Sequence, residues 1–132
     1  MKTGEKNLSL LLKNIQPFLN KGEYVFSSIS SFETIDPDKI IMSFKEEEGI
    51  TIIVAKCTAE AYNLSYSFIA SWITLKIHSS LEAVGLTAAF SNALAKYNIS
   101  CNVVAGFYHD HVFVAKKDEV KAIQVLSNLA KR

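Results

Sequence analysis

Two short segments of this 132-residue chain hold most of the side chains that could do chemistry. They contain all three histidines, two serines, a tyrosine and an aspartate, namely His78, Ser79, Ser80, Tyr108, His109, Asp110 and His111. Backbone N–H groups at the start of a helix carry partial positive charge, so a helix that begins at Ser80 would suit a carboxylate. The hydroxyl and imidazole groups would add hydrogen bonds. A first interpretation of the pattern is therefore a site for a small ligand that carries a carboxylate.

Two other interpretations of the histidines stay open. Two imidazoles and a carboxylate from separate segments have the donor atoms for a divalent ion, although the spacing His109-x-His111 is common by chance. Alternatively, the histidines and serines only cap strand ends and a helix. Acid–base catalysis by His78 with Asp110 is conceivable, but no GxSxG, HExxH or phosphate-binding glycine loop occurs. The favoured interpretation therefore has no catalytic residue, no metal and no cofactor.

The expected order of elements brings the two segments together. Ser79-Ser80-Leu81-Glu82 fits a capping box at a helix start, and His109-Asp110 is expected to form a tight turn. The expected elements are a strand over 68–78, a helix from Ser80 to about Tyr97, strands over 102–108 and 111–115, and a helix over 120–129. In this β-α-β-β-α order, the first strand ends where the turn between the second and third strands lies. All three histidines are therefore expected at one end of one sheet.

The first half of the chain predicts strands in excess of helices. The expected elements are a helix on the apolar stripe Leu8 to Ile15, a strand over 24–29, a hairpin of strands 40–45 and 50–56, and a short helix over 58–62. Gly49 is expected in the hairpin turn with a positive φ. The second half lacks the last strand of a ferredoxin-like unit, so we expect the first half or a dimer partner to supply it. We predict an amino-terminal half over 1–64 and a carboxy-terminal half over 65–132.

Composition narrows the classes of function. The chain has 14 Lys and Arg against 13 Asp and Glu, and so lacks the excess of cations on which non-specific nucleic-acid binding depends. Cys57 and Cys101 form no CxxC pair, and we expect both to be buried in a reducing compartment. The apolar runs have the length of strands rather than of membrane spans. We therefore expect a cytoplasmic protein that binds neither nucleic acid nor membrane.

Two long runs carry a resemblance to a known family. They are residues 73–88, ITLKIHSSLEAVGLTA, and residues 102–114, NVVAGFYHDHVFV. The segments 22–26 and 48–54 fit the same family more loosely. Together they make the chain resemble a family of small proteins built from tandem ACT-type domains.

The resemblance implies an α+β, ferredoxin-like βαββαβ fold in tandem halves, with antiparallel sheet and helices on one face. It further implies a regulatory or sensing protein that binds an amino-acid-like ligand, forms a homodimer and acts on a separate protein. In that family the ligand lies near the first strand–helix junction, which here corresponds to His78, Ser79, Ser80, Leu81 and Gly85. The alternative from another class is an interaction or oligomerisation module without a small ligand.

Overall fold

The computed structural model describes residues 7–76 and 83–130. The chain divides into two compact units. Unit 1 comprises residues 1–20 and 71–132, and unit 2 comprises residues 21–70. Each unit is described by itself below.

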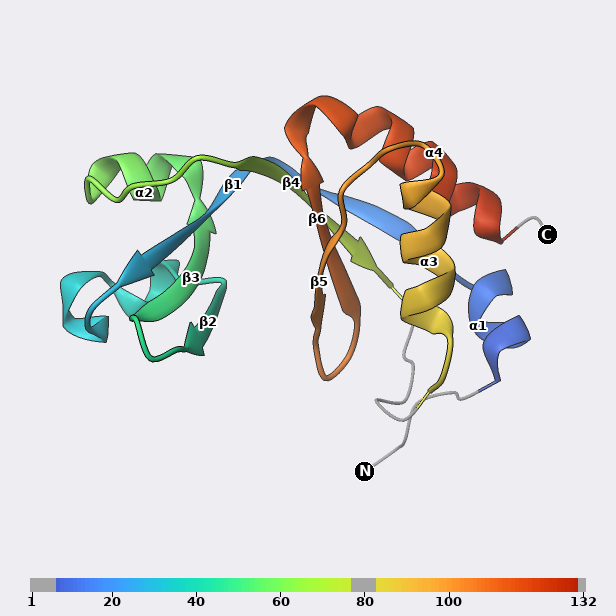
Figure 1. Ribbon diagram of the computed structural model, residues 1–132, viewed down its shortest axis with the longest axis horizontal. Coiled ribbons are helices and arrows are strands. Elements are labelled where there is room, and N and C mark those ends of the chain that lie inside the picture. The colour runs from blue at the N-terminus through green and yellow to red at the C-terminus, as the bar shows by residue number, and fades with distance from the viewer. Residues whose placement is uncertain (1–6, 77–82, 131–132) are drawn as a thin grey trace. The chain divides into compact units, whose positions relative to one another are not determined.

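Unit 1 combines strands and helices in the order expected for an α+β protein (Figure 1). Its elements are α1 (Leu8–Lys13), the first part of β1 (Pro17–Ile29), most of β4 (Ile69–Leu75), α3 (Leu86–Ala95), β5 (Asn102–Ala105), β6 (Asp110–Ala115), a short 3-10 helix (Lys116–Asp118) and α4 (Glu119–Leu129). The strands are hydrogen-bonded in the order β1-β4-β6-β5, and β5 pairs with β6 antiparallel. This is the strand order of a ferredoxin-like fold, with β1 in the place of the last strand.

The missing strand of the second half is therefore supplied from the amino-terminal end of the chain. The backbone N–H of Lys76 donates to the carbonyl of Gln16 at 2.9 Å. Four residues further along β1, the side-chain amide of Asn20 donates to the carbonyl of Trp72 at 3.2 Å. The contacts progress in opposite directions along the two strands, as in an antiparallel pair. The strand order therefore confirms the expectation that the first half of the chain supplies the missing strand to the sheet of the second half.

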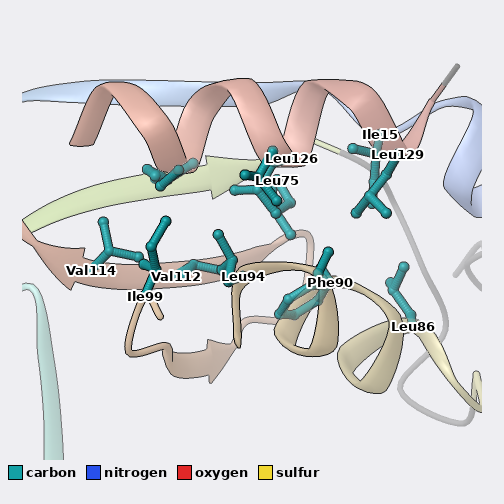
Figure 2. Packing of buried hydrophobic residues seen from close by; sticks show 14 of the residues in the cluster. Ile15, Leu75, Leu86, Phe90, Leu94, Ile99, Val112, Val114, Leu126 and Leu129 are labelled. Carbon is teal, nitrogen blue, oxygen red and sulfur yellow. The ribbon is translucent and has the colours of Figure 1, made fainter. Parts of the chain in front are cut away.

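The core of unit 1 lies on one face of the sheet, between the strands and the helices (Figure 2). Leu86, Phe90 and Leu94 recur at a spacing of four residues and form the buried stripe of α3. Side chains of α4, β4 and β6 point into the same interior, among them Leu126, Leu129, Leu75, Val112 and Val114. Alternation along β4 and β6 then places Trp72, Thr74, His111 and Phe113 on the opposite face.

A polar contact also holds α4 to the sheet. The hydroxyl of Ser71 is buried and donates to the carboxylate of Glu119 at 2.7 Å. The ammonium of Lys116 donates to the same carboxylate at 2.8 Å. The bonds from Lys116 and Ser71 hold the pKa of Glu119 below its usual value.

Unit 2 contains the rest of β1, two short 3-10 helices and a hairpin followed by a helix. Its elements are the 3-10 helices Phe32–Thr34 and Pro37–Lys39, β2 (Met42–Lys45), β3 (Ile50–Ala55) and α2 (Lys56–Ala61). β3 pairs antiparallel with both β1 and β2. Its core consists of Val25, Ile29, Ile35, Ile52, Val54 and Ala59.

Gly49 is required in unit 2 for a different reason from the one expected. Within the described residues, only Gly22 and Gly85 among the glycines have a positive φ, so the prediction for Gly49 is wrong. A Cβ atom on Gly49 would lie 2.6 Å from the Ser28 hydroxyl oxygen and 3.2 Å from the Ile29 carbonyl oxygen. The position therefore needs glycine because β1 passes close to the hairpin turn.

The start of α3 also differs from the prediction. In the described residues α3 begins at Leu86, and residues 83–85 are not helical. The predicted capping box Ser79–Glu82 lies outside the described residues. Gly85 is its N-cap, with a φ of 93° that an L side chain rarely adopts. A Cβ atom there would lie 3.1 Å from Cδ2 of Leu8, on α1. A close approach of α1 and a left-handed residue therefore set the start of the helix.

Candidate functional site

The end of β4 and the β5–β6 hairpin lie side by side in unit 1. The rings of Trp72 and Phe113 stack with centroids 6.0 Å apart. Two residues further along β4, the Thr74 hydroxyl oxygen lies 3.1 Å from Nδ1 of His111. Because β6 begins at Asp110, these contacts place the carboxyl end of β4 beside the hairpin turn. The expected proximity of strand end and turn is confirmed for the described residues.

Four of the predicted site residues lie outside the described residues, namely His78, Ser79, Ser80 and Leu81. Their assignment to a ligand site stays a prediction. Gly85 is described, and a Cβ atom added there would meet Leu8 rather than a residue of the hairpin.

The hairpin turn lies two residues earlier than predicted. Residues 107 and 108 form the bend, and the N–H of Gly106 donates to the carbonyl of His109 at 2.9 Å. Asp110 belongs to β6 and lies opposite Ala105 of β5. The predicted turn at His109-Asp110 is therefore wrong, because strand pairing extends as far as Asp110.

The four predicted hairpin residues have different surroundings. Tyr108 is 66% exposed, and its ring meets the ring of Phe107 edge-on with centroids 5.0 Å apart. Asp110 is only 7% exposed. His109 and His111 are half-buried, and Nδ1 of His109 is buried with no hydrogen-bond partner among the described residues. The hairpin thus has two aromatic residues at its turn, followed in sequence by His109, Asp110 and His111.

His111 takes part in a polar network that crosses three strands. The indole N–H of Trp72 donates to Nδ1 of His111 at 3.0 Å. The side-chain amide of Asn20 donates to the hydroxyl oxygen of Thr74 at 3.0 Å, and that oxygen lies 3.1 Å from the same Nδ1. Asn20, Thr74 and Trp72 were not among the predicted site residues. The alternation of β4, which puts Trp72 and Thr74 on the face opposite to Leu75, is the signal that could have found them.

The electrostatics of the hairpin follow from burial. Burial lowers the pKa of His111, and the nearby charge of His109 lowers it further. Burial raises the pKa of Asp110, and His109 offsets part of that rise. The surroundings therefore shift both His111 and Asp110 toward their neutral forms.

Replacement of Asp110 by asparagine is expected to raise the melting temperature at neutral pH. The pKa of Asp110 is higher in the folded chain than its usual 3.8. Asp110 therefore stabilises the fold fully when the pH is below its pKa in the unfolded chain. This stabilisation is lost as the pH rises through its pKa in the folded chain. Asparagine has no charge to desolvate, so the advantage of the variant should grow with rising pH.

Thermal unfolding at several pH values between about 4 and 8 checks this expectation. Asp38→Asn is the control, because Asp38 is exposed. An Asp110→Asn advantage that is the same at every pH would show that carboxylate burial is not its cause.

The described residues contain no group of three His, Cys, Asp or Glu side chains that could hold a metal ion. Cys57 is exposed, so the prediction that both cysteines are buried is wrong. Cys101 is half-buried, and burial raises the pKa of its thiol to about 11. No helix in the described part of the chain is long and apolar enough to cross a membrane.

Unit 2 holds a cavity of about 340 Å³ between β1, β3 and α2. Its charged lining consists of Lys21, Glu23, Lys56 and Glu60. The ammonium of Lys56 lies 3.9 Å from a carboxylate oxygen of Glu23 and 3.7 Å from one of Glu60. Because two lysines balance two glutamates in a partly exposed lining, this cavity favours no charged ligand.

Comparison with known proteins defines the class of this fold. Models of the ACT domain match residues 3–71 and residues 67–128. A protein of unknown function from Vibrio cholerae, described as a possible transport protein, is 43% identical, with 95% of this chain and 97% of that chain covered and a TM-score of 0.85. No curated protein matches the chain. The chain belongs to the ACT-domain family and carries two such domains in tandem.

More distant structures share the fold alone. The ligand-free regulatory subunit of aspartate kinase from Thermus thermophilus has a TM-score of 0.64 at 8% identity, with 88% of this chain and 98% of that chain covered. A putative carboxy-terminal regulatory domain of aspartate kinase from Porphyromonas gingivalis has a TM-score of 0.61 at 18% identity, with 89% and 98% covered. These neighbours and the two family matches confirm the predicted resemblance and fold class. The predicted boundary between residues 64 and 65 stays a prediction.

Proposed function

We propose that this chain is a non-enzymatic ACT-type regulatory protein that binds a small amino-acid-like ligand at the carboxyl end of β4. The tandem ACT domains support a regulatory role. The observation that carries the proposal is the proximity of the β4 end to the hairpin residues Tyr108–His111, since Thr74 and Trp72 both contact His111. The predicted strand–helix junction follows directly on that strand end.

The proposed site combines two segments with different tasks. Ser79 and Ser80, with the neighbouring backbone through Leu81 and Gly85, would hold the ligand carboxylate, and His78 would help to shape the rest of the site. Tyr108, with its exposed ring, and the half-buried His109 and His111 would shape the rest of the site together with Asp110. The chain would act as a homodimer on a separate protein in the cytoplasm.

Thermal unfolding in the presence of single amino acids tests the proposal. A ligand that binds only the folded state stabilises it by RT ln(1 + [L]/Kd), about 2.7 kcal/mol at a hundredfold excess over Kd. One or a few members of a full amino-acid panel at millimolar concentration are expected to raise the melting temperature. A panel without any effect would remove the support for a ligand of this class.

Two matched variants separate a ligand site from a general effect on folding. Tyr108 is 66% exposed on the hairpin of unit 1, and Phe44 is 67% exposed on β2 of unit 2. Alanine at either position should change the stability of the ligand-free protein by no more than about 0.5 kcal/mol. Only Tyr108→Ala should reduce the ligand-induced rise in melting temperature. An equal reduction in both variants would contradict the proposed place of the site.

A further inference from the structure

We infer that His111 binds a proton and that its Nδ1 atom then changes its hydrogen-bond partner. In the neutral ring the partner is Trp72 on β4, and in the protonated ring it is Thr74 on the same strand. The inference does not depend on the proposed ligand. It rests on the donor and acceptor chemistry of three side chains in unit 1.

The neutral state follows from the bond to Trp72. An indole N–H can only donate, and it lies 3.0 Å from Nδ1 of His111. Nδ1 must therefore be an acceptor without a proton, and the neutral ring carries its proton on Nε2. The structure thus selects one of the two neutral tautomers of His111.

Protonation reverses the role of the same nitrogen. In the imidazolium both ring nitrogens are donors, so Nδ1–H would face the N–H of Trp72 and the bond between them is lost. The hydroxyl oxygen of Thr74, 3.1 Å from Nδ1, has two lone pairs and can accept the new bond. The amide of Asn20 donates to that oxygen at 3.0 Å and uses one of the lone pairs. The network therefore has one arrangement for each charge state of His111.

Groups close to His111 also influence how readily its ring is protonated. Among the described residues, the charge that acts on His111 is that of His109, on its own hairpin. Asp110 directly precedes His111 in sequence, and Lys76 lies two residues after Thr74, just beyond the end of β4. The ammonium of Lys76 lies over the ring of Phe18, 3.9 Å from its centroid. On β5 the residue opposite His111 is Val104, which carries no charge. Burial and His109 both lower the pKa of His111, in agreement with a bond that needs the neutral ring.

The protein carries its own reporter, because Trp72 is the sole tryptophan of the chain. Its ring centroid lies 5.8 Å from that of His111. A protonated imidazole in contact with an indole quenches its fluorescence. Trp72 fluorescence should therefore fall as the pH is lowered, with a midpoint below 6.5, the usual pKa of histidine. The transition should vanish in His111→Gln and persist in His109→Gln, with circular dichroism showing that both variants remain folded.

Two further variants should move the midpoint in opposite directions. Trp72→Phe removes the donor to the neutral ring, so the pKa of His111, followed by NMR of its ring protons, should rise by roughly half to one unit. Thr74→Val removes the acceptor of the charged ring, so that pKa should fall by a similar amount. The inference would be overturned if both variants shifted the pKa of His111 in the same direction, or if neither shifted it. It would also be overturned if nitrogen NMR showed a proton on Nδ1 of the neutral ring, at a pH of roughly 7.5.

Discussion

Replacement of Phe90 by alanine is expected to destabilise the protein by about 3–5 kcal/mol. Phe90 lies in the middle of α3 and is fully buried in the core of unit 1. Its ring packs among residues of the helices and the sheet (Figure 2). Alanine removes most of the buried apolar surface of that side chain and leaves a cavity that the surrounding helices and strands can only partly close.

Urea unfolding followed by Trp72 fluorescence measures this loss, because Trp72 belongs to the same unit. Val84→Ala is the control, since Val84 precedes α3 in sequence and is 83% exposed. It should change the free energy of unfolding by no more than about 0.5 kcal/mol. A loss below about 1 kcal/mol in Phe90→Ala would contradict the assigned core.

Replacement of Gly106 by alanine is expected to destabilise the β5–β6 hairpin by about 1–3 kcal/mol. An added Cβ atom would lie 2.8 Å from the carbonyl oxygen of His109 and 3.2 Å from Nε2 of His111. The first of these atoms belongs to the backbone and accepts the bond that closes the turn. The substitution therefore requires a shift of the hairpin and of the His111 ring together.

The effect of Gly106→Ala should be visible in two measurements. The melting temperature should fall, and the NMR resonance of the Trp72 indole proton should move because its acceptor, Nδ1 of His111, moves. Tyr108→Ala on the same turn is the control, since its side chain is mostly exposed. An alanine variant with unchanged stability and an unchanged indole resonance would show that the hairpin does not pass as close to Gly106 as described.

The periodic patterns of the sequence predicted which elements exist more successfully than where they begin and end. The stripe Leu86, Phe90 and Leu94 is buried as the helical spacing indicates. Asn7 accepts the backbone N–H of Leu10 as the N-cap of α1, in agreement with its place before the apolar stripe. A repeat in hydrophobicity reports which face of an element is buried, and this depends little on neighbouring elements.

Boundaries were less predictable because they depend on contacts with distant residues. The capping-box pattern favoured a helix from Ser80, yet α3 begins after Gly85, which has a left-handed backbone and faces Leu8 of α1. The hairpin turn was expected at His109-Asp110, but the pairing of Asp110 with Ala105 moves it toward the amino terminus. In the hairpin, strand pairing outweighed the local turn preference, and at α3 the described helix starts where Gly85 approaches a second helix.

The sequence by itself determined the fold class, the family resemblance and the placement of the β4 end beside the hairpin. Hydrophobic periodicity indicates the order of strands and helices, and that order is compatible with few topologies besides the ferredoxin-like one. Only the tertiary structure showed that the segment Pro17–Asn20 completes the sheet of unit 1. It also decided the partners of His111, which lie 37 and 39 residues away in the chain. The physical reason is that cross-strand hydrogen bonds depend on the register of strands that are distant in sequence, and no local pattern of residues specifies that register.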